Sequence, residues 1–276
     1  MRKVIVVMGI GLVGAALVFA KASDDTEARK DFAAAKVLLD QKNYTEAQAA
    51  FEKITKDYPT AAPDILANAR QSVGACMYWQ SNYAEARAVL EAALTDYPSA
   101  SVNFRADLQK SAGDCLFGAK DFVAAQSAFE KVLKDYPTAG VWILSSAQAA
   151  VGTCLQNQQS FVLAQAAYEK VLANYPAANP SLLASAQRNV GRCLEAQGVA
   201  AGANAAFMAC VQNYSWLLGA ASDQSVIWQS FEQVNPKLMT VVEYKAFLEN
   251  TIKAIKAIPA NADFIGRLQS ELDKLK

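Results

Sequence analysis

The chain of 276 residues contains five cysteines and no histidine. The cysteines are therefore the first residues to consider for catalysis, metal binding or disulfides. A Ser-His-Asp or Cys-His catalytic group, a histidine metal ligand and an imidazole pH switch are therefore excluded. The cysteines are Cys76, Cys115, Cys154, Cys193 and Cys210. We find no nucleophile–base pair, carboxylate dyad, phosphate-binding loop or metal-ligand cluster in the sequence, and we predict a chain that is not an enzyme and uses no cofactor or metal.

The first four cysteines stand 39 residues apart. Like positions in stacked helix pairs are separated by about two helix-packing distances, each roughly 8–10 Å, whereas a disulfide needs Cα atoms within about 7 Å. We therefore expect these four to be small buried side chains. A disulfide between Cys193 and Cys210, which belong to different helices of one predicted hairpin, stays an open alternative. Zinc is not expected, because the chain lacks both a Cys-x-x-Cys motif and histidine.

The 39-residue spacing extends well beyond the cysteines and divides the chain into repeats. Tyr-Pro pairs recur at this step, and Tyr214 stands where the next pair would begin. Four columns of one residue kind share the step. They are Tyr58, Tyr97, Tyr136 and Tyr175; Ala47, Ala86, Ala125, Ala164 and Ala203; Phe51, Leu90, Phe129, Tyr168 and Phe207; and Gly74, Gly113, Gly152 and Gly191. Five units thus keep one register without an insertion.

Each unit is predicted to form two helices joined by a short polar turn. In the second unit, apolar residues recur at helical spacing in both halves. They are Ile65, Ala69, Val73, Gly74 and Met77 in the first half, and Tyr83, Ala86, Leu90, Ala93, Leu94 and Tyr97 in the second. Each set lies on one face of an α-helix, and the proline after Tyr97 ends the second helix. Gly74 and Ala86 lack bulk where the two helices approach, and Leu90 is expected to fill the space beside them.

These columns follow the order of a known repeat pattern: a pair ending in glycine, then alanine, a large apolar residue, a small residue and proline. In the second unit they are Val73-Gly74, Ala86, Leu90, Ala93 and Pro98. On these residues the chain resembles the tetratricopeptide repeat (TPR) family. The long units are similar to those of bacterial envelope members, such as the Tol–Pal-associated periplasmic protein and the outer-membrane assembly lipoprotein. The family's early aromatic residue is missing, and Arg70, Gln109, Gln148 and Gln187 stand in its place.

The resemblance implies an all-α, right-handed α-solenoid of five 39-residue helix hairpins, whose first helices line a concave face. Residues outside the core of these helices are then the candidates for binding a partner. They are Asn68, Gln71, Tyr78, Trp79, Lys110, Asp114, Phe117, Asn157, Arg188 and Arg192. Tyr78, Trp79 and Phe117 are favoured as anchors because aromatic residues dominate binding energies. Arg188 and Arg192 are four residues apart on one helical face, where they could hold an acidic group.

The N-terminal residues 1–22 have the anatomy of a secretory signal peptide. Arg2 and Lys3 precede seventeen uncharged residues, and Ala20-Lys21-Ala22 forms a cleavage pattern. The alternative is an uncleaved anchor formed by residues 4–20, which would be the chain's only membrane contact. Cleavage would leave 23 basic and 26 acidic residues, where the whole chain has 26 of each. We therefore expect an exported, mildly acidic protein of the periplasm or cell envelope, without the basic field that nucleic acid attracts.

The sequence divides into three parts: the segment 1–22, the TPR-like array 23–219 and a C-terminal helical capping region 220–276. Three helices are predicted in the last part, because apolar residues keep a helical spacing between Pro236 and Pro259 and on either side of them. Terminal parts of repeat arrays are usually atypical caps. Docking of these amphipathic helices onto a partner is the alternative.

The predicted function is a non-catalytic, exported scaffold that binds a peptide or partner protein in the bacterial cell envelope. The alternative is a small-ligand-binding component of an envelope transport or polymer system. An enclosed apolar pocket lined by Tyr78, Trp79 and Phe117 would favour the small ligand, and an open groove with a mixed polar lining would favour the peptide or protein.

Overall fold

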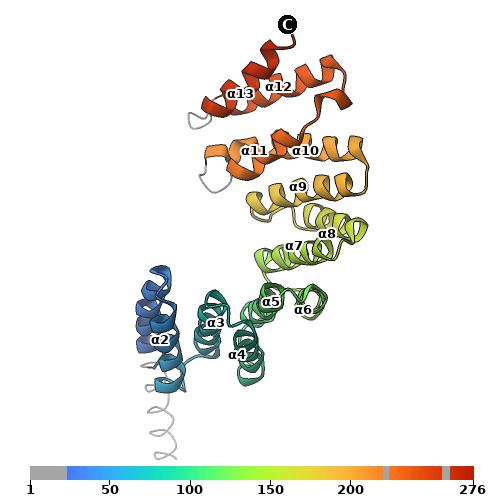
Figure 1. Ribbon diagram of the computed structural model, residues 1–276. Coiled ribbons are helices and arrows are strands. Elements are labelled where there is room, and N and C mark those ends of the chain that lie inside the picture. The colour runs from blue at the N-terminus through green and yellow to red at the C-terminus, as the bar shows by residue number, and fades with distance from the viewer. Residues whose placement is uncertain (1–23, 220–223, 257–261) are drawn as a thin grey trace, which may run out of the picture. The chain divides into compact units, whose positions relative to one another are not determined.

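The computed structural model describes residues 24–219, 224–256 and 262–276, and all regular structure within these ranges is helical (Figure 1). The predicted signal peptide 1–22 lies outside the described residues. In the part that is described, no helix is both long and apolar enough to cross a membrane. The chain folds as two compact parts, each larger than a 39-residue repeat. From here on, Met1–Ile143 is called the first unit and Leu144–Lys276 the second unit, and they are described in turn.

The helices follow the 39-residue rhythm that the sequence predicts. The first helices of the repeats are the segment 24–40, α3 (Pro63–Trp79), α5 (Val102–Gly118), α7 (Val141–Asn157) and α9 (Pro180–Ala196). The second helices are α2 (Tyr44–Asp57), α4 (Tyr83–Asp96), α6 (Phe122–Asp135), α8 (Phe161–Asn174) and α10 (Ala200–Tyr214). From α2 to α10, like helices begin 39 residues apart. The all-helical fold of consecutively paired helices is therefore confirmed.

The turn inside each hairpin is made by one residue in the left-handed region. In the second hairpin this residue is Ser81, with φ 65°. Its N–H donates to the carbonyl of Tyr78 (2.9 Å), and the N–H of Asn82 donates to the carbonyl of Met77 (2.9 Å). This pair of bonds is a Schellman motif, which satisfies carbonyls left free at a helix end. The equivalent residues of the other hairpins also have positive φ: Lys42, Lys120, Gln159 and Gly198.

The repeated Tyr-Pro pair ends each second helix. The N–H of Tyr97 still donates to the carbonyl of Ala93 (3.1 Å), and the carbonyl of Tyr97 then accepts from the N–H of Ala100 (3.1 Å). Pro98 takes the second position of this turn, where its fixed φ is suited and no N–H is needed. Ala100 is buried, so the turn also places a small side chain in the core.

The two helices of a hairpin touch where the sequence has glycine. A Cβ built on Gly74 would lie 2.8 Å from Cγ of Leu90, which is closer than side-chain atoms approach. Leu90 is 1% exposed and fills the space that the missing side chain leaves. The same contact recurs in three further hairpins, at Gly113 with Phe129, Gly152 with Tyr168 and Gly191 with Phe207. The expected role of the glycine column is confirmed.

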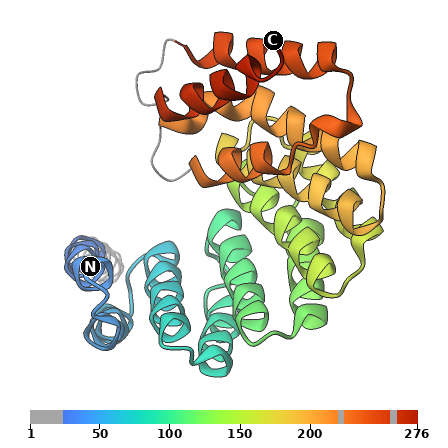
Figure 2. The same ribbon diagram turned by 45° about the horizontal axis from the view of Figure 1, so that its top comes forward.

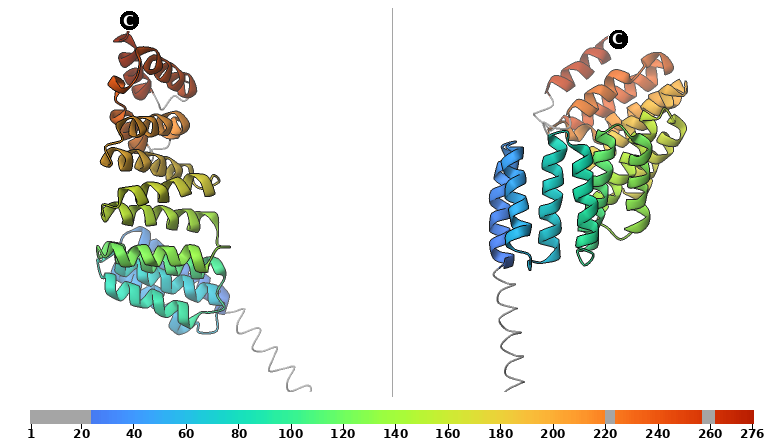
Figure 3. Two further views of the ribbon diagram at one scale, coloured as in Figure 1. Left: turned by 90° about the vertical axis from the view of Figure 1, so that its right-hand side faces the viewer. Right: turned by 60° about the horizontal axis from the view of Figure 1, so that its bottom comes forward.

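In the first unit, each hairpin is tied to the next through a first helix. The helices stand side by side with nearly parallel axes in the right-hand view of Figure 3, and α3 contacts α2, α4 and α5. Asp64 accepts a hydrogen bond from the N–H of Ser101 (2.6 Å), which precedes α5. Asp25, 39 residues earlier, accepts from the N–H of Ala62 (2.6 Å) in the same way. Apolar burial between the hairpins provides the rest of the contact.

In the second unit, glutamines take the place of the family's early aromatic residue. Gln148 of α7 donates to the carbonyl of Ala167 (3.3 Å), and Gln187 of α9 donates to that of Ala206 (3.4 Å). Each glutamine thus links the two helices of its hairpin through a hydrogen bond to the backbone. This sequence departs from the family pattern without losing the contact between the two helices.

The chain after α10 leaves the repeat, as predicted. The 3₁₀ turns η1 (Ser215–Gly219) and η2 (Pro236–Leu238) interrupt the helices α11 (Gln224–Gln233), α12 (Val241–Ile255) and α13 (Ala262–Asp273). Helices α11 and α12 contact α10, and α13 contacts α12 (Figure 1, Figure 2). Phe207 of α10 shares one buried cluster with Phe231, Phe247 and Phe264. The expected helices are present, and the division at residue 219 stays a prediction.

All five cysteines are free and buried. The disulfide considered between Cys193 and Cys210 is therefore absent. The thiol of Cys210 donates to the carbonyl of Ala184 (3.3 Å) and accepts from the hydroxyl of Ser230 (3.2 Å). Burial raises the pKa of both Cys193 and Cys210 to about 11. Such thiols are protonated and unreactive at neutral pH, which agrees with their predicted role as small core residues.

Candidate partner-binding site

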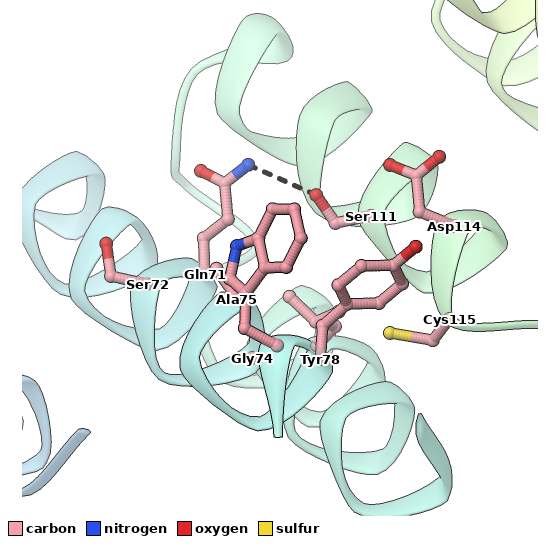
Figure 4. Close-up of a pocket in the computed structure, with 10 residues that line it drawn as sticks. Gln71, Ser72, Gly74, Ala75, Tyr78, Ser111, Asp114 and Cys115 are labelled. Carbon is pink, nitrogen blue, oxygen red and sulfur yellow. Dashed lines mark hydrogen bonds between the residues drawn. The ribbon is translucent and has the colours of Figure 1, made fainter. Parts of the chain in front are cut away.

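A hollow of about 390 Å³ lies on the first-helix face of the first unit (Figure 4). Helices α3 and α5 provide most of its lining, and α4 contributes one residue. The lining residues are Gln71, Ser72, Gly74, Ala75, Tyr78, Trp79, Leu90, Ser111, Asp114 and Cys115. Four of the predicted partner-binding residues, Gln71, Tyr78, Trp79 and Asp114, are thus brought together here. We call this cavity the α3–α5 hollow.

Aromatic rings form one side of the α3–α5 hollow. Trp79 is 61% exposed at the end of α3, and its ring stacks on that of Tyr44, with centroids 6.3 Å apart. The ring of Tyr78 meets that of Trp79 edge-on at 5.5 Å and that of Tyr83 at 5.3 Å. These contacts hold the two candidate rings in place from both neighbouring second helices. The Trp79 ring is therefore positioned before any partner arrives, which lowers the entropy cost of binding.

Polar groups of α5 form the other side. Gln71 donates to a carboxylate oxygen of Asp107 (2.6 Å) and to the hydroxyl of Ser111 (3.3 Å), the bond drawn in Figure 4. Lys110 donates to Oδ2 of Asp114 at 2.7 Å. The hydroxyl end of the Tyr78 ring points toward the Asp114 carboxylate (Figure 4). Tyrosine, amide and carboxylate groups therefore converge on one cavity.

Asp107 and Asp114 are the two carboxyl groups on this side, and the positive charge of Lys110 does not fully offset their negative charge. Burial raises the pKa of Asp107 above its usual range, although the hydrogen bond from Gln71 and the charge of Lys110 act in the opposite direction. Burial likewise raises the pKa of Asp114, and the nearby charge of Asp107 adds to the effect. Burial also raises the pKa of Tyr78. One lysine thus faces two partly buried carboxylates, which leaves an excess of negative charge beside the hollow.

The remaining predicted residues of the first unit lie elsewhere. Asn68 lines a separate hollow of about 330 Å³, together with Arg29 and Phe104. Phe117 is not among the residues that line either cavity, and its ring packs against that of Phe122, with centroids 5.2 Å apart. Phe117 thus does not line a pocket with Tyr78 and Trp79, the arrangement that would have favoured a small ligand, because the α5–α6 turn places Phe122 within its reach.

Two of the three predicted residues of the second unit line a polar hollow of about 460 Å³. Asn157 and Arg192 line it, with Thr153, Gln156 and the ring of Tyr168. Arg188 is not among the lining residues. Its buried Nε has no hydrogen-bond partner in the described part of the chain, and burial beside Arg192 lowers its pKa.

Reasoning from the sequence missed two contributors to the α3–α5 hollow. Tyr44, which stands 39 residues before the core-face residue Tyr83, was not singled out, yet its ring supports Trp79. Ser111, which accepts from Gln71, was not singled out. The repeat could have predicted the role of Tyr44. The start of each second helix lies beside the end of the first helix of the next repeat, which places Tyr44 near Trp79. Among the described residues, no three His, Cys, Asp or Glu side chains are gathered as a metal site would require.

Comparison with known proteins bears on the family and the fold. The model of the tetratricopeptide repeat matches residues 31–61, 73–100 and 111–139. No curated protein matches the chain. Among solved structures, PilW, a type IV pilus biogenesis factor, is 18% identical with a TM-score of 0.53, over 90% of this chain and 97% of that chain.

Two further structures share the fold. A tetratricopeptide repeat protein from Parabacteroides merdae is 14% identical with a TM-score of 0.52, over 91% of this chain and 98% of that chain. Rap, solved in complex with Competence and Sporulation Factor, is 12% identical with a TM-score of 0.51, over 91% of this chain and 76% of that chain. The resemblance predicted from the repeat columns is therefore confirmed: the matched residues between 31 and 139 carry tetratricopeptide repeats, and these solved structures share the fold.

Proposed function

We propose that this chain is a non-catalytic scaffold that binds a peptide or a segment of a partner protein in the α3–α5 hollow. One observation carries the proposal: the 61% exposed Trp79 is held in place by Tyr44 and Tyr78 beside a polar wall. Exposing a large ordered aromatic ring costs hydrophobic free energy, which a bound partner recovers. The fold-level relative Rap, solved with Competence and Sporulation Factor, supports a binding role for such a scaffold.

The lining of the hollow favours a peptide over a small ligand. Its residues combine the apolar Leu90 and the aromatic rings with Gln71, Ser111 and Asp114. Trp79 opens to solvent, so the cavity is not an enclosed apolar pocket of the kind that a small molecule would fill. A peptide can place one side chain in the hollow and leave its backbone outside. We therefore prefer the peptide or protein partner to the small envelope ligand.

Export to the bacterial cell envelope is the second part of the proposal. It rests on the sequence of residues 1–22, with Arg2 and Lys3 before an apolar run and Ala20-Lys21-Ala22 after it. Cell fractionation followed by N-terminal sequencing tests it. A periplasmic or envelope-bound chain beginning at Ser23 supports export with cleavage. A membrane-bound chain that keeps Met1 supports the anchor, and a chain that stays in the cytoplasm contradicts export.

Site-specific photocrosslinking in intact cells tests the binding role. A photoreactive amino acid at position 79 should give a discrete crosslinked product. The same amino acid at Glu169, exposed on α8 of the second unit, serves as the control and should give none. Loss of the product when Ala replaces Tyr78 would tie it to the hollow. Equal products at both positions, or none at position 79, would contradict the proposal.

A further inference from the structure

The α3–α5 hollow combines an aromatic wall with uncompensated negative charge. Asp107, Lys110 and Asp114 follow one another on α5, and the single lysine donates only to Oδ2 of Asp114. Oδ1 of Asp114 accepts no hydrogen bond from the residues that the structure describes. The other charged pair nearby, Arg87 and Glu91 on α4, is already joined at 3.3 Å. A group that enters the hollow therefore meets a net negative field.

The aromatic wall is suited to the same kind of group. The face of an indole or phenol ring attracts a cation through its quadrupole, and tryptophan does so best. Trp79 and Tyr78 meet edge-on at an angle of 87°, so two differently oriented ring surfaces border the cavity. An anionic side chain would be repelled by Asp114, and a neutral polar side chain would gain less from these faces than a cation. A cation would interact favourably with both walls.

We propose that the α3–α5 hollow recognises a lysine or arginine side chain of the partner segment, with an adjacent apolar residue covering the aromatic rings. This inference rests on the proposed function and names the chemistry of the partner. A volume of about 390 Å³ holds one long basic side chain and part of an apolar neighbour. The guanidinium or ammonium group lies between the Tyr78 and Trp79 rings and the free carboxylate oxygen of Asp114, while its aliphatic stem covers the apolar lining.

Selection of random heptapeptides displayed on phage against the immobilised full-length chain provides the first test. The Trp79→Ala chain identifies the peptides whose binding needs the hollow, and Trp216→Ala, an exposed tryptophan of the second unit, is the matched control. Trp79-dependent peptides enriched in Lys or Arg beside an apolar residue support the inference. Trp79-dependent peptides that are acidic or show no charge enrichment overturn the inference and leave the proposed function standing. Failure to obtain any Trp79-dependent peptide overturns both.

A double-mutant cycle then locates the charge. In the selected peptide, replacing the basic residue with citrulline, a neutral isostere of arginine, should weaken binding to the natural chain about tenfold. On the Asp114→Asn chain the same replacement should weaken binding much less, because the carboxylate that pairs with the basic residue is absent. Asp96→Asn, at an exposed carboxyl on α4, should keep the tenfold effect. An unchanged citrulline effect on Asp114→Asn would overturn the assignment, and circular dichroism checks that each variant is folded.

Discussion

Glycine is the residue on which each hairpin depends, because the large residue opposite occupies the volume that a side chain would need. The contact between Gly74 and Leu90 recurs with a phenylalanine or tyrosine in other repeats. The large residue opposite the glycine differs between repeats, whereas the glycine is constant. What these positions share is therefore the short distance between the two helices, which leaves no space for a side chain. Packing at crystalline density leaves no room to absorb an added methyl group.

Gly74→Ala is expected to destabilise the fold by about 1–3 kcal/mol, the usual cost of overpacking a core. Its Cβ would lie 2.8 Å from Cγ of the buried Leu90, so this side chain would have to shift. Urea unfolding followed by circular dichroism measures the change. Gly266→Ala on α13 is the control, since its Cβ would meet nothing within 4 Å. It should stabilise by up to about 1 kcal/mol through helix propensity. Equal effects of the two variants would contradict the overpacking explanation.

The partly buried carboxyl of Asp107 should give the fold a measurable pH dependence. Its pKa is raised in the folded state by burial, so the folded chain binds more protons than the unfolded chain between the ordinary and the raised pKa. Its contribution to the unfolding free energy is therefore favourable at low pH and is lost as the pH rises through that window. Asp107→Asn keeps the acceptor for Gln71 and should remove this loss, so that its stability relative to the natural chain increases from about pH 4 to about pH 6.5.

Asp273→Asn is the matched control for this pH dependence. The pKa of Asp273 is lowered by hydrogen bonds from Lys276 and Gln269, so its stabilising contribution is gained as the pH rises. Nearly all of that gain is complete by about pH 4, so the stability of the variant relative to the natural chain should hardly change over the same interval. Urea unfolding at the two pH values gives both differences. An increase of equal size in the Asp273→Asn variant would show that the pH dependence arises elsewhere.

At the scale of the element, the turn between paired helices shows how backbone geometry can be kept without glycine. Five equivalent turn residues have positive φ, and only Gly198 among them is glycine. The left-handed conformation costs other residues roughly 1–2 kcal/mol. The Schellman hydrogen bonds and the packing of both helices hold Lys42, Ser81, Lys120 and Gln159 in it.

Exchanging residues at these turns should change stability in opposite directions. Gly198→Ala is expected to cost about 1 kcal/mol through backbone strain alone, because its added Cβ would meet no atom within 4 Å. Ser81→Gly should stabilise by a few tenths to about 1 kcal/mol, since glycine adopts φ 65° without steric cost. Thermal unfolding of both variants measures the shifts. Stabilisation by Gly198→Ala would show that the strain is absent.

At the scale of the whole molecule, the columns that are buried inside the repeats change character where the array begins. The inner repeat has Ile65, Leu66 and Ala69 in these columns, all buried. The segment 24–40 has Thr26, Glu27 and Lys30 there, all exposed. Glu27 and Lys30 pair with each other at 3.6 Å. A polar outer face of this kind keeps the end of a repeat array soluble.

Placing the apolar residues of the inner repeat at the equivalent positions of the segment 24–40 should make the chain self-associate. The triple change Thr26→Ile, Glu27→Leu and Lys30→Ala creates an exposed apolar patch of the kind that repeats bury against one another. Sedimentation velocity should then show dimers or larger species at micromolar concentration. The control changes Thr55→Ile, Glu52→Leu and Lys53→Ala exchange the same residue types on α2 and should leave the sedimentation unchanged. A triple variant that sediments like the natural chain would contradict a capping role for these residues.

The fold was predictable because its signals lie between residues that are close together in the sequence or separated by the constant repeat step. The 39-residue step, the helical spacing and the Tyr-Pro stops predicted the paired helices, and the helix bounds repeat with the same step. The site was predictable only in part. Tyr78, Trp79, Gln71 and Asp114 were singled out as non-core residues of first helices, and all four line one hollow. Phe117 belongs to the same class by sequence but packs against Phe122.

Sequence alone determined the repeat, the resemblance to the tetratricopeptide repeat family, the absence of histidine chemistry and the cysteine column, because each follows from residue type and spacing along the chain. Only the tertiary structure decided that Tyr44 supports Trp79, that Gln71 reaches Asp107 across two helices, and that Cys193 and Cys210 remain unbonded. These contacts depend on distances between helices 30 or more residues apart, or on side-chain directions within a hairpin. Periodicity fixes which face a residue occupies, and packing decides which neighbour it meets there.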